Sequence, residues 1–184
     1  MESASDTYYV RKVQAGETRY FAPLLERYSH PVFSLIVKMT GNREDAEELT
    51  QDVFLKVYRS LGSFLGECRF STWLYRIAYN TAISSLRKQK HEWLTLEGDM
   101  LENVADEENA EPTGEDWQLD RLEQALAQLP PDERALILLF YRQEKRVEEI
   151  ATIMGLSVSN VKTRLHRVRK RLQALMQVAE KDSE

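Results

Sequence analysis

Apolar residues recur at intervals of three and four along most of the chain, which is the spacing of one buried face of an α-helix. Such stripes run through residues 20–39, 43–61 and 71–90. The clearest stripe lies near the C-terminus and consists of Val158, Val161, Leu165, Val168, Leu172 and Leu175. Glycine and proline, which interrupt helices, number only 7 and 5 among 184 residues. The sequence therefore predicts an all-α fold, in which Pro31 kinks or interrupts one helix and Ser71 caps another.

The formal net charge of −5 is concentrated in the middle of the chain. Residues 91–120 contain eleven acidic residues and no Lys or Arg, whereas residues 1–90 and 121–184 each have a net charge of +3. A uniformly acidic chain would argue against nucleic-acid binding, because phosphate contacts need a positive surface. The two basic flanks leave that function open.

The acidic middle segment also lacks clear helical periodicity and contains Pro112 and Gly114. This composition is typical of a linker, and we expect residues 93–117 to be flexible or partly ordered. The segments on either side are long enough for each to bury a small core. We therefore predict two small helical domains, at 8–92 and 118–178, joined by an acidic linker.

The composition argues against several other classes of protein. With 42% hydrophobic and 30% charged residues, the chain has the composition of a folded protein in water. No run approaches the roughly 20 apolar residues of a membrane span, and the N-terminus has no signal-peptide pattern. Cys68 is the only cysteine, so an internal disulfide and a cysteine-based zinc site are excluded. We expect a cytoplasmic protein with no metal, no cofactor and no direct membrane insertion.

Catalytic chemistry has little support in the sequence. An all-helical enzyme would need a cluster of catalytic groups, yet the chain has only three widely spaced His, no nucleophile motif and no glycine-rich phosphate loop. We therefore expect neither catalytic residues nor a small-molecule substrate.

Residues 147–161 have the layout of a helix-turn-helix. The inner face of the first helix would consist of Ile150, Ala151 and Met154. Gly155 permits a positive φ at the turn, and Ser157 can cap the second helix. This layout predicts a DNA-reading unit in the C-terminal domain.

The second helix of this unit has a basic face. Thr163, His166, Arg167 and Lys170 lie opposite its apolar stripe, and Lys162, Arg164 and Arg171 flank it. Residues 162–171 include six Lys or Arg and no acid, as a recognition helix needs in order to contact base edges and phosphates. Taken alone, the same pattern is also that of a solvated basic face on an ordinary amphipathic helix.

Aromatic and basic residues are interleaved in the segment 70–88. The aromatic residues are Trp73, Tyr75 and Tyr79, and the basic ones in and beside the segment are Arg69, Arg76, Arg87 and Lys88. Proteins that bind single strands stack unpaired bases on aromatic rings and hold the backbone with cations. We expect Trp73 to belong to the core, whereas Arg76 and Asn80 are better placed for contact.

The chain resembles the sigma factors of bacterial RNA polymerase. Residues 45–58 (DAEELTQDVFLKVY), Phe64 and residues 70–80 (FSTWLYRIAYN) are similar to sigma region 2. Leu129, Pro130 and Arg134, followed by the helix-turn-helix, are similar to region 4. The order of the two regions and the length match the small extracytoplasmic-function (ECF) type, and the resemblance covers about 8–92 and 118–176.

The resemblance implies site residues for each role. Those implied to contact the −35 promoter element are Arg146, Ser157, Lys162, Thr163, His166, Arg167 and Lys170. Those implied to hold the melted −10 strand, with one base flipped into the loop 62–69, are Phe64, Arg69, Trp73, Arg76, Asn80, Arg87 and Lys88. Those implied to bind core RNA polymerase are Asp45, Glu48, Gln51, Asp52 and Phe54.

The resemblance also implies partners. Core RNA polymerase would contact the helix of 45–58 through the coiled coil of its β′ subunit and would also contact the chain through its β subunit. An anti-sigma factor would hold the protein inactive, in some cases at the inner face of the membrane, until a stress response releases it. Promoter DNA is the third partner.

Three alternatives stay open at this point. A helix-turn-helix repressor or activator explains the C-terminal segment equally well, but does not explain the N-terminal motifs and the acidic linker together. Phe64 can pack inward as a loop anchor instead of meeting a base. Cys68, in the same loop, can be a redox group, although an unremarkable small residue is the simpler interpretation.

Overall fold

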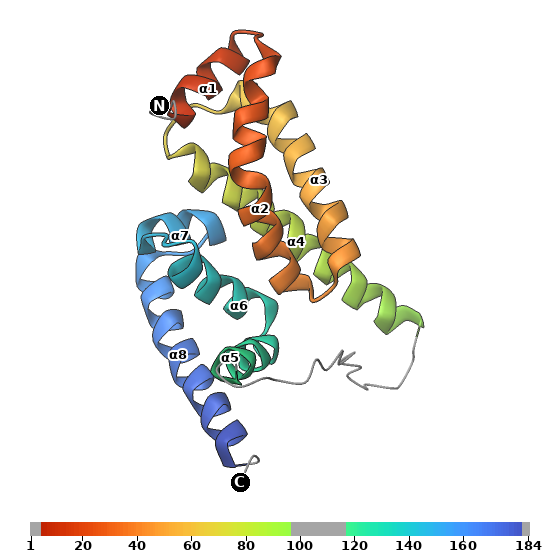
Figure 1. The fold of residues 1–184 in the computed structure, drawn as a ribbon, viewed down its shortest axis with the longest axis vertical. Coiled ribbons are helices and arrows are strands. Elements are labelled where there is room, and N and C mark those ends of the chain that lie inside the picture. The colour runs from red at the N-terminus through yellow and green to blue at the C-terminus, as the bar shows by residue number, and fades with distance from the viewer. Residues whose placement is uncertain (1–4, 97–116, 182–184) are drawn as a thin grey trace.

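The computed structural model describes residues 5–96 and 117–181, and these contain helices and no β-strand (Figure 1). The helices are α1 (Asp6–Gln14), η1 (Thr18–Tyr20), α2 (Phe21–Thr40), α3 (Arg43–Ser60), η2 (Leu61–Ser63), α4 (Phe70–Leu96), α5 (Trp117–Ala127), α6 (Pro131–Ile137), η3 (Leu138–Arg142), α7 (Val147–Met154) and α8 (Val158–Lys181). The predicted all-α class is confirmed. The central part of the predicted linker lies outside the described residues.

The N-terminal unit, α1 to α4, is built on the packing of α2, α3 and α4. Its fully buried side chains include Leu24, Val32, Leu35, Ile36, Val53, Val57 and Leu74. Gly41 ends α2 at φ 71°, where its N–H donates to the Val37 carbonyl. The Asn42 side chain then accepts from the Asp45 N–H at 3.0 Å and caps α3. This turn places α2 and α3 side by side.

Two local expectations in this unit need correction. α2 is one continuous helix with Pro31 inside it, so the proline does not interrupt it. α4 begins at Phe70, so Ser71 lies in the first turn and is not its cap. The Ser71 hydroxyl accepts a hydrogen bond from Lys145 of the C-terminal unit instead, at 3.1 Å.

The C-terminal unit, α5 to α8, follows the expected pattern more closely. Pro131 occupies the first turn of α6, where a missing N–H is tolerated. The helix then continues into a π-helical turn, η3, which the apolar spacing did not predict. The buried residues Leu136, Leu139, Ile150, Val161 and Leu165 join α6, α7 and α8 in one core.

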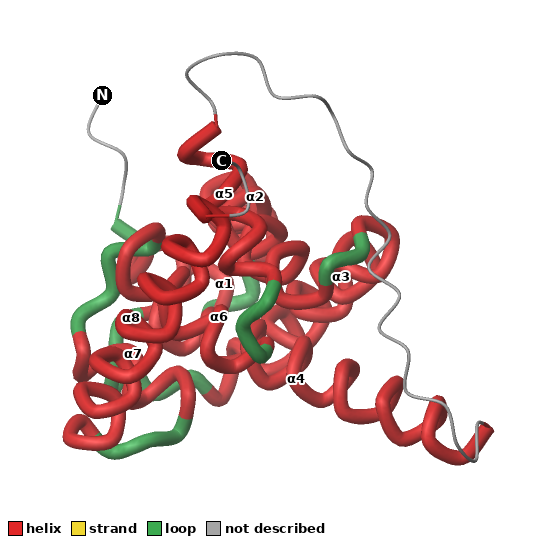
Figure 2. The backbone as a smooth tube through the Cα atoms, turned by 90° about the horizontal axis from the view of Figure 1, so that it is seen from below, coloured by secondary structure: helices red, strands yellow, loops and turns green. Residues whose placement is uncertain are grey.

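The two units pack directly on each other. Helices α6 and α7 lie beside α2 and α4, so that segments more than 70 residues apart in the sequence are in contact (Figure 1). In the perpendicular view, the C-terminal half of α4 extends away from the body of the molecule (Figure 2). The free chain is therefore one body with two helical units.

Candidate nucleic-acid and polymerase interfaces

Helices α7 and α8 form the predicted helix-turn-helix. Gly155 adopts φ 68° between them, and the Leu156 N–H donates to the Ala151 carbonyl at 2.9 Å. The Ser157 hydroxyl accepts from the Asn160 N–H at 3.1 Å, so the predicted cap is present. Besides Ile150 and Ala151, α7 buries Ile153 completely, whereas Met154 is half-buried. The pattern did not single out Ile153, because α7 packs on α4 of the N-terminal unit as well as on α8 within the motif.

The basic residues of α8 differ in their partners, and Arg169 lies over the rings of Phe140 and Tyr141. Arg164 donates to Asp132 at 3.2 Å and to Asn160 at 3.1 Å, and Arg171 donates to Glu133 at 2.6 Å. The candidate DNA-contacting residues of this helix are all exposed, namely Lys162, Thr163, His166, Arg167 and Lys170. Within the described part of the chain, no acidic side chain forms an ion pair with Lys162, Arg167 or Lys170. The structure therefore leaves the face opposite the apolar stripe accessible and positively charged.

The loop between η2 and α4 rests on aromatic packing. The ring of Phe64 lies 5.0 Å from that of Trp73 and 6.2 Å from that of Phe70, between ring centroids, and both Phe64 and Trp73 are half-buried. Phe64 is thus packed inward, while its neighbour Leu65 is 81% exposed. Gly66 turns the loop at φ 75°, a backbone conformation that favours glycine.

The polar candidates beside this loop lie in solvent. Arg69, Arg76, Asn80, Arg87 and Lys88 are all exposed. Arg76, Asn80 and Arg87 are separated by four and seven residues, so they share one face of α4. Tyr75 and Tyr79, by contrast, are buried. The aromatic–basic interleaving in the sequence therefore separates into a buried aromatic side and an exposed polar side.

The candidate polymerase-binding residues on α3 differ in their exposure to solvent. Glu48, Gln51 and Asp52 are exposed, and Asp45 is half-buried and accepts from Gln89 at 3.2 Å. Phe54, which the resemblance implies in polymerase binding, is only 6% exposed. It forms part of a groove of 660 Å³ between α2 and α3.

The exposed apolar residues of this groove were missed in the sequence. Leu25 of α2 and Leu55 and Tyr58 of α3 are 40%, 50% and 43% exposed. Gln51, Leu55 and Tyr58 are spaced by four and three, which is a second stripe on α3 beside the buried one. That spacing could have revealed the exposed apolar residues of α3. No sequence pattern marked Leu25, because its position opposite α3 depends on tertiary packing.

Comparison with known proteins identifies the family. Residues 24–92 match the family described as sigma-70 region 2, and residues 119–172 match sigma-70 region 4. The chain is 34% identical to the RNA polymerase sigma-H factor of Pseudomonas aeruginosa over 94% of both chains. It is 33% identical to the ECF RNA polymerase sigma-E factor of Escherichia coli K12 over 96% of both.

The chain is an ECF sigma factor. Its fold is similar to that of the sigma factor RpoE from Bartonella quintana, solved in complex with the anti-sigma factor NepR, with a TM-score of 0.70, 27% identity and coverage of 86% of this chain and 97% of that one. Family membership decides between the interpretations of the helix-turn-helix that the sequence left open. The protein directs promoter-specific initiation of transcription as a sigma factor and is not a repressor.

A side chain outside all the predicted sets supports the loop of the sigma factor. The amide of Gln14, at the end of α1, donates to the carbonyls of Leu61 and Phe64, each at 3.0 Å. These bonds tie α1 to the start of the loop that carries Phe64. A glutamine in the last turn of a short helix gives no sequence signal for such contacts, which span 47 and 50 residues.

Cys68 of the sigma factor lies half-buried in the loop that precedes α4. Burial raises the pKa of this thiol above its usual range, more than the charge of Arg76 lowers it. A reactive cysteine needs a lowered pKa, because the thiolate is the nucleophile. The raised pKa and the partial burial of Cys68 favour the simpler interpretation of this residue.

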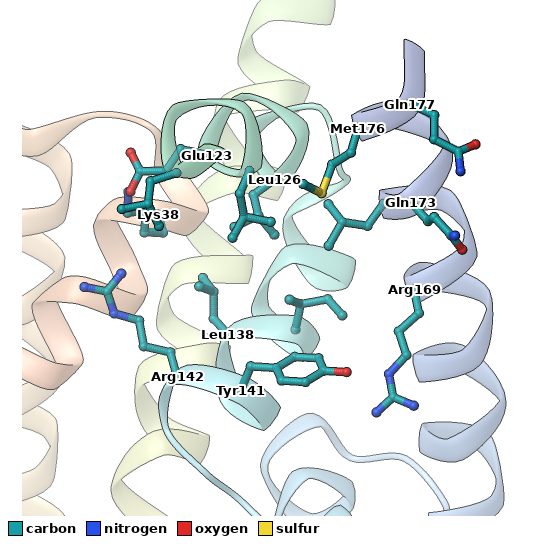
Figure 3. A pocket seen from close by; sticks show the side chains of 14 residues that line it. Lys38, Glu123, Leu126, Leu138, Tyr141, Arg142, Arg169, Gln173, Met176 and Gln177 are labelled. Atoms are coloured by element: carbon teal, nitrogen blue, oxygen red, sulfur yellow. The ribbon is translucent and has the colours of Figure 1, made fainter. Parts of the chain in front are cut away.

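A second apolar groove of the sigma factor, of 760 Å³, lies between α5, η3 and α8 (Figure 3). Its lining includes Leu126, Leu138, Tyr141 and Met176. Lys38 of α2 and Glu123 of α5 also line it, and they form an ion pair at 2.6 Å.

The described residues contain neither a cluster of metal ligands nor a membrane-spanning helix. Over residues 5–96 and 117–181, no three side chains are grouped so as to hold a metal ion. None of the helices in those ranges has the length and apolarity needed to cross a membrane.

Proposed function

We propose that the sigma factor reads the −35 element with the exposed face of α8. The supporting observation is that only some cations of α8 are paired with acids. Arg164 and Arg171 form ion pairs with acids of α6. Lys162, Arg167 and Lys170 are exposed and form no ion pair within the described residues. Unpaired cations can meet phosphates and base edges in the major groove. Thr163 and His166 lie on the same face, and Arg146 and Ser157 at the starts of α7 and α8 are placed for phosphate contacts.

The melted −10 strand is the proposed ligand of the N-terminal unit. Arg76, Asn80 and Arg87 offer an exposed polar track along α4, continued by Arg69 and Lys88. Leu65 and Gly66 form the exposed tip of the loop, where a base could be received. In this arrangement Phe64 and Trp73 act mainly as the floor that holds the loop.

Core RNA polymerase is the proposed partner of two grooves. The groove between α2 and α3 has apolar walls and an acidic border at Glu48 and Asp52, which suits a helical partner with basic residues such as the β′ coiled coil. The groove between α5 and α8 is the corresponding candidate for the β subunit.

Control by an anti-sigma factor is proposed from the family and from the solved relative, which is bound to one. Such a partner could retain the protein at the inner face of the membrane until a stress signal arrives. We place the functional domains at 8–92 and 118–178, with the linker 93–117 between them. The protein acts without catalytic activity of its own and has no cofactor.

A run-off transcription assay tests this function. Purified core polymerase is given a promoter selected by genomic binding, with and without the chain. We expect a defined transcript only when the chain is added. Core polymerase that gains no promoter-specific start from the chain would refute the proposal, and binding assays with the separate partners would then show which contact fails.

A further inference from the structure

The side-chain amide of Asn160 has a hydrogen-bond partner for its oxygen only. Asn160 lies in the first turn of α8, where its backbone N–H donates to the hydroxyl of the Ser157 cap at 3.1 Å. Its side-chain Oδ1 accepts from Nε of Arg164, one helical turn further along, at 3.1 Å. Within the described residues, no hydrogen bond involves the Nδ2 of Asn160. The amide therefore offers one unused group, which is a donor.

The chemistry of Arg164 decides which end of the amide faces it. A guanidinium N–H can only donate, so the atom of Asn160 that lies 3.1 Å from the Nε of Arg164 must be the oxygen. With the amide turned by 180°, two donors would face each other. The contact thereby fixes the nitrogen of Asn160 on the side away from Arg164.

Arg164 is itself held from a second side. It is half-buried, and its Nη1 donates to Oδ2 of Asp132 in the first turn of α6 at 3.2 Å. The contacts from Asp132 through Arg164 to Asn160 therefore run from a helix with a buried face to the exposed start of α8. A side chain that is ordered before its ligand arrives loses less conformational entropy on binding. Asn160 is a pre-ordered donor.

Asn160 lies at the N-terminal end of the proposed −35 face. It is exposed and precedes Thr163 and Arg167 by three and seven residues, so the three share one face of α8. The first residues of a recognition helix are those that reach base edges in the major groove. The resemblance assigned no contact to Asn160, but its position suits one.

A free asparagine and Asn160 differ in the bases that they can read. Free asparagine pairs with adenine through two bonds, accepting from N6 and donating to N7. The oxygen of Asn160 already accepts from a cation, which weakens it toward a second donor and polarises Nδ2 as a stronger donor. Guanine presents two acceptors, O6 and N7, whereas cytosine presents only the N4 donor. A donor-only amide therefore favours guanine over adenine and disfavours cytosine.

We propose that Asn160 is a specificity-determining residue of the sigma factor and selects guanine over adenine at one position of the −35 element. Arg164 and Asp132 are positioning residues, since they act through the amide of Asn160. This inference rests on the proposed use of the exposed face of α8 for the −35 element.

The variant Asn160→Asp tests the donor. Aspartate keeps the shape of the side chain and an oxygen for Arg164, but has no N–H. Holoenzyme reconstituted with core polymerase is titrated with duplex promoters that carry each of the four base pairs at each −35 position. We expect the preference for guanine at one position to fall about fivefold, and cytosine, which can donate to a carboxylate, to gain. Base preferences equal to those of the wild type at every position would overturn the role of Asn160.

The variant Arg164→Met tests the positioning role. It frees the oxygen of Asn160, so adenine should gain on guanine by roughly fivefold at the same position. Arg171→Met is the matched control, because it removes a cation that pairs with Glu133 of α6 at 2.6 Å but has no bond to Asn160. Both variants should lose affinity on all sequences, whereas only Arg164→Met should change the base preference. Equal base preferences in the two variants would overturn the role of Arg164.

The wild-type holoenzyme in the same titration tests the proposed function separately. If it discriminates between base pairs at no −35 position, the proposed use of the α8 face is wrong. If it discriminates and Asn160→Asp changes no preference, only the inference about Asn160 fails. Circular dichroism of each variant confirms that the helices are intact.

Discussion

The carboxylate of Asp132 on α6 accepts a hydrogen bond from the guanidinium of Arg164 on α8, at 3.2 Å. This pair joins the helix that supports the helix-turn-helix to the flank of its recognition helix. The acid pairs with a cation that flanks the proposed DNA-binding face beside Lys162 and Arg167. On that proposal, the pair leaves one cation fewer for phosphate contacts.

Replacing this acid should strengthen DNA binding without improving specificity. In Asp132→Asn, Arg164 becomes available for a phosphate, so affinity should rise on all sequences and the salt dependence should steepen by about one unit of log K against log salt. Titration of duplex DNA at several salt concentrations measures both effects. Glu148→Gln removes the same charge from an exposed site on α7 and is the control. If the two variants change DNA affinity and its salt dependence equally, the effect comes from net charge and not from the release of Arg164.

Docking on core polymerase should depend on the acidic border of the α2–α3 groove. Asp52→Arg reverses an exposed charge and should lower the affinity for core polymerase about tenfold, because a basic partner is then repelled. Affinity measured by competition, together with circular dichroism of the variant, separates docking from folding. Glu47→Arg changes an exposed acid on another face of α3 and should have little effect. If both variants bind core polymerase as the wild type does, the docking face lies elsewhere.

Gln14 should position the loop that receives the −10 strand. Gln14→Leu removes two hydrogen bonds to loop carbonyls, and the affinity for single-stranded −10 DNA should fall on the order of fivefold. Discrimination between the −10 sequence and a scrambled strand should fall as well, while duplex binding to the −35 element stays unchanged. Gln124→Leu on α5 is the control. Unaltered discrimination in Gln14→Leu would contradict this role.

Glu149 should link the stability of the sigma factor to pH. Burial alone would raise the pKa of its carboxylate, but hydrogen bonds from the Arg146 N–H and Thr72, with the charges of Lys145 and Arg69, hold the pKa below its ordinary value. A group with a lowered pKa stabilises the folded state above its unfolded pKa of about 4.3, and this contribution is lost as pH falls through the folded pKa. Glu149→Gln should therefore be less stable than wild type at pH 7 and lose most of that difference near pH 3. Urea unfolding at both pH values measures the difference in free energy of unfolding between wild type and variant. An equal difference at pH 7 and pH 3 would contradict this linkage.

The sequence predicted the features that depend on local spacing and local capping. The stripe from Val158 to Leu175, the turn at Gly155 and the cap at Ser157 need only helix periodicity and backbone geometry, and the first turn of α6 at Pro131 needs only the properties of proline. The exposed face of α8 followed from the same periodicity.

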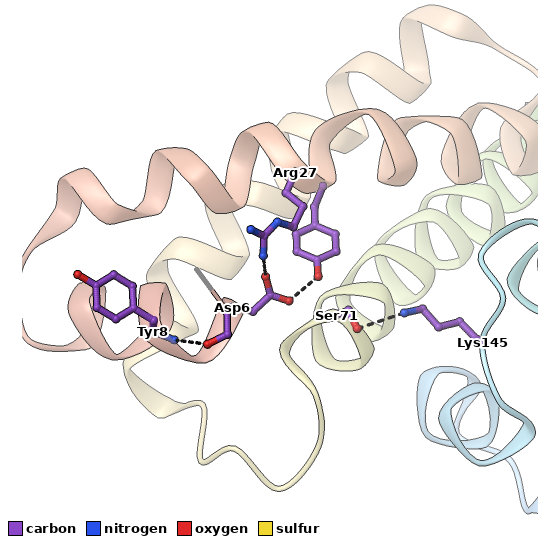
Figure 4. A network of polar contacts seen from close by, with 7 residues as sticks. Asp6, Tyr8, Arg27, Ser71 and Lys145 are labelled. Atoms are coloured by element: carbon purple, nitrogen blue, oxygen red, sulfur yellow. Dashed lines mark hydrogen bonds and ion pairs between the residues drawn. The ribbon is translucent and has the colours of Figure 1, made fainter. Parts of the chain in front are cut away.

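The features that the sequence did not predict depend on contacts between distant segments. Phe54 is buried on α3, which packs against α2 and α4, and Ile153 is buried on α7, which packs against α4, α8 and η3. Ser71 does not cap α4, because the helix already begins at Phe70, and its hydroxyl accepts from Lys145 of the other unit instead (Figure 4). The apolar periodicity of a single helix does not show which distant segments pack against it or bond to its side chains. The assignment of individual residues to DNA and polymerase remains a prediction for the same reason, because those contacts involve other molecules.

The most direct test of the central claim uses Arg167→Ala in reconstituted transcription. Core polymerase with wild-type or variant sigma factor is presented with a panel of promoters that differ at single positions of the −35 element. We expect the variant to lose discrimination at one base position, equivalent to roughly 1–3 kcal/mol, and to keep it at the others. An equal loss of initiation on every promoter, or no loss on any, would contradict the claim that the exposed face of α8 reads the −35 sequence.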